Sequence, residues 1–435
     1  MASKKTVITI LGSGGGVAKA VLAILNKSAA DVNDPIHSKI KHAIIHLIDI
    51  KQKKLAYYRK YCPNLAGKLV LHEFDLMRGN LFMHHLRRTR TRLVIDVSWA
   101  DTNKMLRCCN RLGVRYVNSA LENTRVDEDE DLEGFTLIER YERFEPVRKA
   151  CTNTTAIVCS GMNPGVVQWM ALTLMKARPN KKPIGLYIVE HDNTFYANKA
   201  KARKDTLYTT WSVECFLDEA ILSYPMLVRN KTPLFLYDDV YAKEYKVTLG
   251  NKRFYGCLMP HEESITLGKM LGVEVGFLYK INDHTTKLIR DNLSDVDDLW
   301  DWRQKVLDPA DAALTGRDLV GVLLVYDDIE TYMYNAMSNK TTYAKYKTNA
   351  TYLQVACGIY GAVSSILLDR LPKGVFYVDS LLKKTKSNYG KYVSYHMKHF
   401  VLGYNDRAEG LLHHRARRFG RKPVMSKRQP LKARR

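Results

Sequence analysis

Cysteine pairs with metal-binding or redox spacing are missing from this sequence. Its 435 residues include eight cysteines, but none form a Cys-x-x-Cys pair, and only Cys108 and Cys109 are neighbours. Structural zinc sites and disulfide frameworks depend on recurrent spacings of this kind. We therefore predict no metal site, no disulfide framework and a reducing compartment.

Long apolar runs are also missing. No run approaches the ~20 residues that cross a bilayer, and the basic start, Met1 to Thr6, leads into a strand pattern without a signal-peptide cleavage site. These absences predict a cytoplasmic protein with no membrane partner. With 46% hydrophobic residues, most of the chain is too apolar to be disordered.

Acidic residues are absent from the end of the chain. The whole sequence has a formal net charge of +23, and Leu411 to Arg435 carries ten Lys and Arg but no Asp or Glu, so 23 − 10 leaves +13 for the rest. Arg415 to Lys422 and Lys432 to Arg435 read as a solvated basic arm. Such an arm fits nucleic-acid contact or a nuclear address, and an uncommitted terminus fits equally well.

The first 120 residues alternate apolar runs with helical patterns, as repeated βα units do. Apolar runs without alternation are typical of a parallel sheet covered on both faces. A helix over Asn103–Leu112 is the clearest of the helical patterns. The predicted strands are Thr6–Leu11, Ile44–Ile50, Leu69–Phe74, Leu93–Val97 and Val114–Val117.

A glycine turn follows the first predicted strand and precedes the helix Val17–Asn26. In a Rossmann-type fold a dinucleotide pyrophosphate meets the backbone N–H groups at this place. Asp49 ends the second strand, where an acid accepts from the ribose 2′-OH and favours NAD over NADP. The alternative is a turn that only packs helix on sheet. The predicted cofactor-binding residues are Gly12, Gly14, Gly15, Gly16, Val17, Asp49 and Ser98.

A second α/β region follows an acidic stretch, Asp127 to Glu133, that reads as a solvated loop. We expect a Rossmann-type, doubly wound parallel sheet and then a second α/β domain with a mixed sheet. The predicted boundaries are 1–155 for the NAD-binding domain, completed by an apolar helix at about 346–372, then 156–345 for a catalytic and dimerisation domain, and 373–435 for an extension. The second region begins with the strand Ala156–Cys159, a glycine turn and the helix Val166–Lys176. Its further strands are predicted at Gly185–Glu190, Lys246–Thr248, Gly321–Tyr326 and Thr331–Tyr334.

Several carboxylates lie at the ends of apolar strands, where a buried charge needs a partner. If they converge on one cleft, the natural guest is a cation; taken singly, each only ends a strand at the surface. Trp211 lies beside them in the sequence and offers a cation–π surface, and His261 can move protons near neutral pH. The carboxylates are Glu122, Glu190, Asp192, Glu214, Glu219 and Asp318.

At these positions the chain resembles homospermidine synthase of the bacterial type, which also occurs in some large viruses and belongs to the saccharopine dehydrogenase-like reductases. The resemblance runs from the first strand to about Leu371. It rests on the stretches Gly161-Met162-Asn163-Pro164-Gly165, Glu190-His191-Asp192, Thr210-Trp211-Ser212-Val213-Glu214, His261-Glu262-Glu263-Ser264-Ile265 and Gly321-Val322-Leu323-Leu324.

The resemblance implies an NAD-dependent aminobutyl transfer. Two putrescines, or putrescine and spermidine, condense through imines with loss of ammonia or diaminopropane, and NAD is oxidised and reduced within one cycle. It also implies a homodimer and, if the chain is viral, the cytoplasm of an infected cell. The resemblance makes Trp211, Glu190, Glu219, His261 and Asn163 catalytic, and makes Glu122, Asp318 and Glu214 substrate-binding.

Two other functions remain open from the sequence. A carboxyspermidine-type or saccharopine-type reductase would need Arg or Lys in the pocket to hold a substrate carboxylate. An inactive relative could use its basic tail to bind nucleic acid, with the salt sensitivity that such binding shows.

Overall fold

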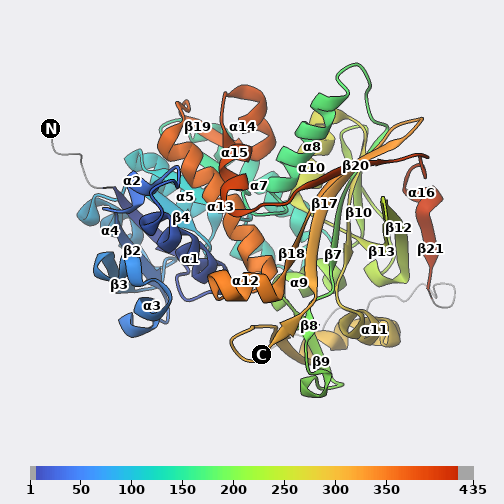
Figure 1. Ribbon diagram of the computed structural model, residues 1–435, viewed down its shortest axis with the longest axis horizontal. Coiled ribbons are helices and arrows are strands. Elements are labelled where there is room, and N and C mark those ends of the chain that lie inside the picture. The colour runs from blue at the N-terminus through green and yellow to red at the C-terminus, as the bar shows by residue number, and fades with distance from the viewer. Residues whose placement is uncertain (1–5, 420–435) are drawn as a thin grey trace.

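The computed structural model describes residues 6–419, apart from the side chains of 295–298. Figure 1 shows two sheet-containing lobes side by side, with the long helix α13 (Ala350–Leu368) between them. The first lobe holds a seven-stranded sheet, and the second holds a ten-stranded one. This arrangement confirms the predicted α/β class with two sheets.

The first sheet is entirely parallel, with the strand order β19-β6-β5-β4-β1-β2-β3. Its central order, 3-2-1-4-5-6, is that of dinucleotide-binding folds. The strands are β1 (Val7–Leu11), β2 (Ile44–Asp49), β3 (Leu69–Glu73), β4 (Leu93–Asp96), β5 (Arg115–Asn118), β6 (Thr155–Val158) and β19 (Gly374–Tyr377). The first six begin and end within one residue of the predicted strands, and β19 was not foreseen.

Helices cover both faces of this sheet and bury a separate apolar core on each. Strand residues such as Ile8 and Ile95 belong to the core on one face of the sheet, and Val94 and Tyr116 belong to the core on the other face. Successive side chains of a strand point to opposite faces of the sheet. Because both faces are covered, the side chains on both are apolar, which agrees with the continuous apolar runs in the sequence. The first layer is α1 (Gly16–Ala30), α13 and α15 (Tyr389–His396), and the second is α4 (Leu81–Thr89), α5 (Thr102–Leu112) and α7 (Thr136–Ala150).

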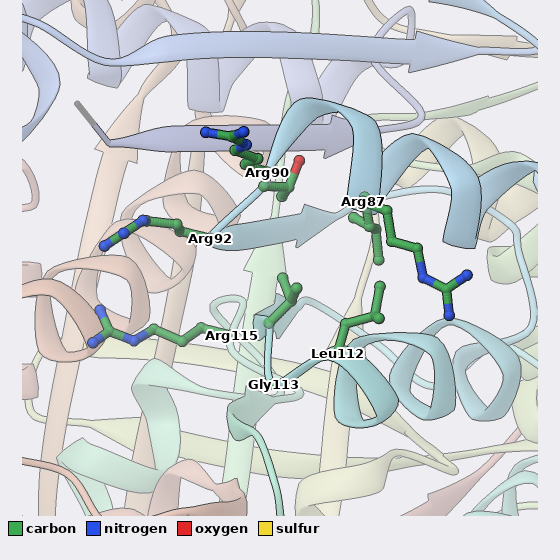
Figure 2. Close-up of a pocket in the computed structure, with 9 residues that line it drawn as sticks. Arg87, Arg90, Arg92, Leu112, Gly113 and Arg115 are labelled. Atoms are coloured by element: carbon green, nitrogen blue, oxygen red, sulfur yellow. The ribbon is translucent and has the colours of Figure 1, made fainter. Parts of the chain in front are cut away.

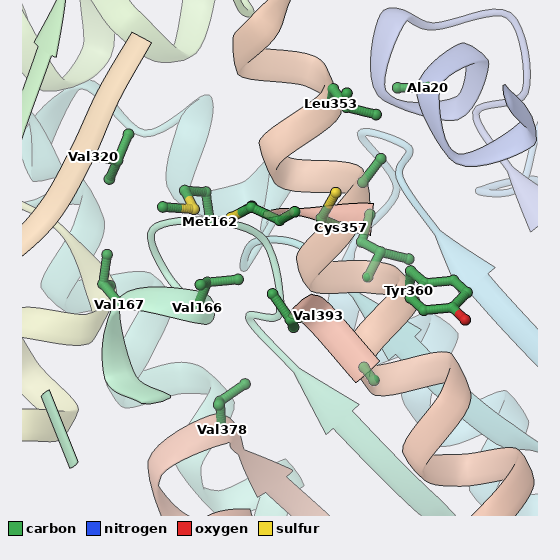
Figure 3. Close-up of a cluster of buried hydrophobic side chains, with 14 of the residues drawn as sticks. Ala20, Met162, Val166, Val167, Val320, Leu353, Cys357, Tyr360, Val378 and Val393 are labelled. Carbon is green, nitrogen blue, oxygen red and sulfur yellow. The ribbon is translucent and has the colours of Figure 1, made fainter. Parts of the chain in front are cut away.

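Helix α13 has the length and apolar composition of a membrane-crossing segment, but it is packed in the interior. Figure 3 shows Leu353 and Cys357 of α13 between Ala20 of α1 and Met162 of the second glycine turn. Gly358 lies so close to that turn that a Cβ would come within 1.9 Å of the Gly161 carbonyl oxygen. The apolar surface of α13 is therefore buried against both lobes of the protein.

The second sheet is mixed, with the path β20-β18-β17-β7-β14-β13-β12-β21 and the hairpin β10-β11 beside β14. Strands β13 and β14, which lie between β7 and β12 in this sheet, were not predicted from the sequence. Helices α8 (Val166–Ala177) and α10 (Glu262–Leu271) pack against it. The strands are β7 (Gly185–Asp192), β10 (Met226–Arg229), β11 (Thr232–Phe235), β12 (Lys243–Leu249), β13 (Lys252–Met259), β14 (Glu274–Lys280), β17 (Arg317–Val325), β18 (Glu330–Ser338), β20 (Val401–Asn405) and β21 (Ala416–Arg418).

Smaller elements connect these layers. Two short sheets pair β9 (Thr206–Thr209) with β15 (Arg303–Val306), and β8 (Phe195–Tyr196) with β16 (Leu314–Thr315). The remaining α-helices are α2 (His37–Ile40), α3 (Leu55–Tyr61), α6 (Thr124–Asp127), α9 (Val213–Leu217), α11 (Asp283–Asp291), α12 (Asn339–Tyr346), α14 (Val378–Lys384) and α16 (Leu412–Arg415).

Two sequence expectations are corrected. The predicted solvated loop, Asp127 to Glu133, is largely exposed, but it includes the last residue of α6 and a 3-10 turn, Glu130–Leu132. The segment from Arg415 to Lys422 was expected to be a solvated arm, but Arg415 is buried on Glu330, and Ala416–Arg418 pairs with β12 as an edge strand. Opposite charges on β12 and β18 draw this segment onto the sheet. Residues 420–435 of the arm lie outside the described chain.

Candidate functional site

The first glycine turn lies at the carboxyl edge of the parallel sheet, where β1 meets α1. Gly12 has a φ of +70°, and a Cβ there would come within 2.6 Å of the Val97 carbonyl oxygen. Ser98 packs against Gly12 and donates through Oγ to Asp96. Only glycine fits this contact between β1 and the end of β4, which places Ser98 beside the glycine turn.

The N-terminus of α1 is open to an anion. Its N-cap is Gly15, with no side-chain cap and no acidic residue in the first turn. The first N–H groups of a helix have no intrahelical acceptor, and the helix dipole favours a negative group there. Gly16 and Val17 begin this helix, and Tyr352 packs against Gly16, where a Cβ would clash with its ring. These residues fit the pyrophosphate of a dinucleotide.

Asp49 ends β2 beside the same turn. Its Oδ2 accepts the Gly14 N–H at 2.7 Å, and its Oδ1 accepts the Lys51 N–H at 3.1 Å. The carboxylate thus holds the glycine turn in place and remains half-exposed. Its remaining lone pairs are available to a ribose hydroxyl.

Replacing Gly12 by alanine should strain the glycine turn. We expect the free energy of unfolding to fall by more than about 1 kcal/mol, because the positive φ and the Val97 contact both oppose a Cβ. Gly67→Ala is the matched control, since nothing lies within 4 Å of a Cβ there. Urea denaturation measures both variants, and equal effects would contradict the strained turn.

A second group of side chains shares one face of the second sheet. Glu190 and Asp192 alternate along β7; Tyr279 of β14 pairs with Glu190, and Asp318 of β17 pairs with Asp192. Register and the two-residue period place all four side chains on the same face. Like charges directly opposite each other destabilise a sheet, so this arrangement points to a function rather than to stability.

Residues from other elements cover this acidic face. Asn163 of the second glycine turn donates through Nδ2 to Glu190 Oε2 at 2.7 Å. Thr351, in the first turn of α13, donates to Asp318 Oδ2 at 2.6 Å, and Thr210 donates to Asp192 Oδ2 at 2.5 Å. Trp211 Nε1 donates to the Tyr279 hydroxyl at 3.3 Å. The cover brings Asn163, Trp211, Glu190 and Asp318 together, which is the convergence that the sequence left open.

The acidic group continues through the start of α10. His261 Nδ1 forms a short hydrogen bond with Glu263 Oε2 and lies 3.7 Å from Glu262 Oε2. Glu262 Oε1 accepts the Leu121 N–H at 3.2 Å, which ties α10 to the segment that carries Glu122. Glu219 lies on a π-helical turn, Asp218–Leu222, that follows α9. Such turns often mark functional sites.

The pKa values of these groups are displaced far from their ordinary range. Burial raises the pKa of Glu190 to about 8, although Asn163 opposes the shift, and burial raises the pKa of Glu122 to about 8 against the pull of Arg140. Burial also raises the pKa of Asp192, Asp318 and Glu219. Burial opposes a charge on His261, but Glu263 and Glu219 outweigh it and raise the pKa of His261 to about 10.

Three buried carboxylate oxygens in this group have no hydrogen-bond partner among residues 6–419. They are Glu219 Oε2, Glu263 Oε1 and Asp318 Oδ1. None of Glu190, Asp192, Glu219, Glu262, Glu263 and Asp318 forms an ion pair with a lysine or arginine in the described chain. Unpaired buried acceptors are costly, and a bound hydrogen-bond donor would relieve that cost.

The structure separates one predicted residue from the others. Glu214 is exposed, and its carboxylate accepts from Ser212 within the first turn of α9. Glu262, Glu263, Tyr279 and Thr351 belong to the acidic group but were not predicted as site residues. Glu262 and Glu263 directly follow His261 in the chain, so the two adjacent acidic residues beside a candidate histidine are the signal that could have identified them.

Two groups of side chains have the composition of metal ligands, although the sequence predicted no metal site. One is His261 with Glu262 and Glu263, inside the acidic group, and the other is His46, His72 and His85 between β2, β3 and α4. His46 Nδ1 lies 2.8 Å from His72 Nε2, so these two imidazoles already share a hydrogen bond. The three histidines come together because β2 and β3 are neighbouring strands and α4 packs beside them. Their spacing in the sequence matches no metal-binding motif.

The fold and site define a two-lobed α/β protein with a dinucleotide-type sheet and a buried acidic site next to it. No protein-family model matches the chain, and no curated protein matches it. The chain is similar in structure to scyllo-inositol dehydrogenase from Lactobacillus casei with bound NAD(H) and scyllo-inositol, at 11% identity over 92% of this chain and 99% of that one, with a TM-score of 0.41.

A second similar structure is UDP-glucose 4-epimerase from Bifidobacterium longum in complex with NAD⁺ and UDP. It shares 12% identity over 35% of this chain and 52% of that one, with a TM-score of 0.25. The matched region thus spans about half the length of the epimerase. Neither of these two proteins is a homospermidine synthase.

Proposed function

We propose that the protein is an NAD-dependent aminobutyl transferase of the homospermidine synthase type, acting on putrescine or spermidine. The observation that supports this most is the set of unpartnered carboxylate oxygens on Glu219, Glu263 and Asp318. A diamine carries an ammonium group at each end, and each ammonium offers three N–H donors. Burial raises the pKa values of Glu219 and Asp318, and a bound ammonium would favour loss of their protons, so that the acidic group then matches the guest in charge and in hydrogen bonding.

NAD bound at the glycine turn would accept a hydride from the carbon beside an amine and return it to the new imine. The chain's own residues hold the amines and move protons. Glu190, with a pKa raised to about 8, can take a proton from an ammonium near neutral pH. The protonated His261 is hydrogen-bonded to Glu263, is further stabilised by the charge of Glu219, and can return one.

Trp211 is proposed to stabilise the cationic imine. Its indole is half-buried and is held by the hydroxyl of Tyr279, the cross-strand neighbour of Glu190. An indole face attracts a desolvated cation by up to about 2 kcal/mol. The carboxyl edge of the first sheet and the acidic face approach each other at the second glycine turn, which supplies Asn163.

The rival condensation with a carboxylate-bearing substrate is less well supported. Such a substrate needs Arg or Lys at its carboxylate. Arg140, whose charge acts on Glu122 and Glu219, is already bound to Asp127 and Asp218. An inactive nucleic-acid binder would have no use for buried, unpaired carboxylates. The proposed homodimer is carried over from the resemblance.

Incubating the purified protein with putrescine and NAD⁺ tests the proposal. We expect homospermidine and ammonia to form with no net NADH, measured by mass spectrometry and absorbance. Putrescine consumed only when a keto acid and NADH are added would favour the rival reductase. No product with either set of substrates would refute both enzymes.

Substitution of Trp211 separates its role from cofactor binding. We expect Trp211→Ala to lower kcat by roughly 30-fold, the equivalent of about 2 kcal/mol of cation–π attraction, and to leave NAD affinity unchanged. Trp211→Phe keeps an aromatic face and should retain part of the rate. Equal losses in the two variants would argue against a cation–π contact.

A further inference from the structure

A hollow of about 510 Å³ opens at the amino-terminal edge of the first sheet, opposite the glycine turn. It lies between the end of α4, the start of β4 and the turn that joins α5 to β5. Figure 2 shows Arg92 and Arg115 extending together on one side of it, with Arg87 on the other side. The four arginines that line it are Arg87, Arg90, Arg92 and Arg115.

These arginines have no acidic neighbours in the hollow. No lining residue is acidic, and within residues 6–419 none of the four forms an ion pair. Arg115 donates from Nη1 to the Ile366 carbonyl, which anchors its side chain. Four exposed guanidinium groups repel one another unless an anion lies between them, and their planar fork suits phosphate.

A second basic hollow, of about 650 Å³, lies along the same helix. Helix α5 has 11 residues and is therefore about 16 Å long. Asp101, the one acidic residue in this hollow, is occupied as the N-cap of α5. The cations that line this second hollow are Lys104, Arg107, Arg111, Arg125 and Arg143.

We propose that this face, from Arg87 to Arg143 across α4 and α5, binds the phosphate backbone of a nucleic acid. A single small phosphate would fill one hollow, whereas a phosphodiester chain carries charge along the whole track of cations. The hollows are concave, so a flat anionic membrane would meet only their rims. The first hollow lies at the other end of the strands from the glycine turn, whereas the second reaches the carboxyl ends of β3 and β5, where Met77, Asn80 and Asn123 line it.

The test uses the full chain and a fluorescently labelled 20-base-pair duplex, with anisotropy measured from about 50 to 200 mM salt. The variant is Arg87→Glu with Arg92→Glu. Within residues 6–419 these two side chains form no ion pair and lie on the exposed surface, so the change should not disturb the fold. The matched control is Lys199→Glu with Lys201→Glu, two exposed lysines on the 3-10 turn Lys199–Lys201, with the same change in charge.

We expect the arginine variant to bind the duplex at least about tenfold more weakly. The slope of log K against log salt concentration should also become shallower by roughly two, the equivalent of two lost phosphate contacts. The lysine control should change by less than about threefold, and both should keep the thermal midpoint of the wild type. Equal affinities for the two variants would place binding elsewhere, the basic tail included, and overturn the proposal. Inorganic pyrophosphate that binds as tightly as the duplex, and is lost in the arginine variant, would also overturn it in favour of a small-anion site.

Discussion

Replacing Glu190 by glutamine is expected to stabilise the ligand-free protein at pH 8.5 and to lower amine turnover by about 100-fold or more. The carboxyl is buried, and burial raises its pKa to about 8. Glutamine keeps an oxygen for the Asn163 amide but never carries the charge. The expected gain in stability and loss of activity share one cause, the cost of a buried carboxylate.

The sign of the pH dependence follows from the raised pKa. The folded protein binds the Glu190 proton more tightly than the unfolded chain does, so this group contributes full stability below its ordinary pKa near 4.5. That contribution is lost as the pH rises through about 8. The stability difference between Glu190→Gln and the wild type should therefore be near zero at pH 4.5 and grow toward pH 8.5.

Thermal unfolding from pH 4.5 to pH 8.5 measures that difference, and adding putrescine at pH 8.5 supplies the second half of the experiment. A diamine should stabilise the wild type and have less effect on the variant, because the variant lacks one acceptor charge. The matched control is Glu214→Gln, an exposed carboxylate outside the acidic group. A variant less stable than the wild type at pH 8.5 would contradict the buried charge.

Replacing Arg415 by alanine is expected to lower the free energy of unfolding of the second lobe by about 3–5 kcal/mol. Arg415 and Glu330 both have fully buried side chains, and the guanidinium also contacts Glu409 and the carbonyls of Gly410 and Lys246. Removing the arginine leaves Glu330 buried with its charge uncompensated. The loss therefore exceeds that of any exposed ion pair.

Urea denaturation followed by tryptophan fluorescence measures this loss. The matched control is Arg418→Ala in β21, the strand that directly follows Arg415; its ion pair with Asp238 is partly exposed and should contribute about 0–1 kcal/mol. A double variant, Glu330→Gln with Arg415→Met, removes both charges and should recover part of the stability. Equal effects of Arg415→Ala and Arg418→Ala would show that the buried pair is not the anchor of this segment.

The two glycine turns show how far local sequence reaches. Gly12 to Gly16 and Gly161 to Gly165 were both placed correctly between a strand and a helix, and the structure finds β1 and α1, then β6 and α8, there. A turn of this kind is set by neighbouring residues alone, because glycine spacing and the adjoining apolar run are both contiguous in the chain. The strand order of the first sheet then follows from repeated βα units.

The acidic group required the tertiary structure. Glu190, Asp318 and Tyr279 are far apart in the chain, and only the register of β7, β14 and β17 puts them on one face. A shift of one residue would turn those side chains to the opposite side of the sheet. Sequence reasoning could name acids near apolar strands, but it could not separate Glu190, which joins the group, from Glu214, which does not.

By itself, the sequence determined the α/β class, the dinucleotide-type sheet and the places of both glycine turns, since each depends on contiguous periodicity and turn residues. Only the tertiary structure decided which carboxylates meet, that Arg415 is buried on Glu330, and that four arginines border one hollow. These contacts join segments far apart in the chain. Their distances are set by strand register and helix packing, which no local pattern encodes.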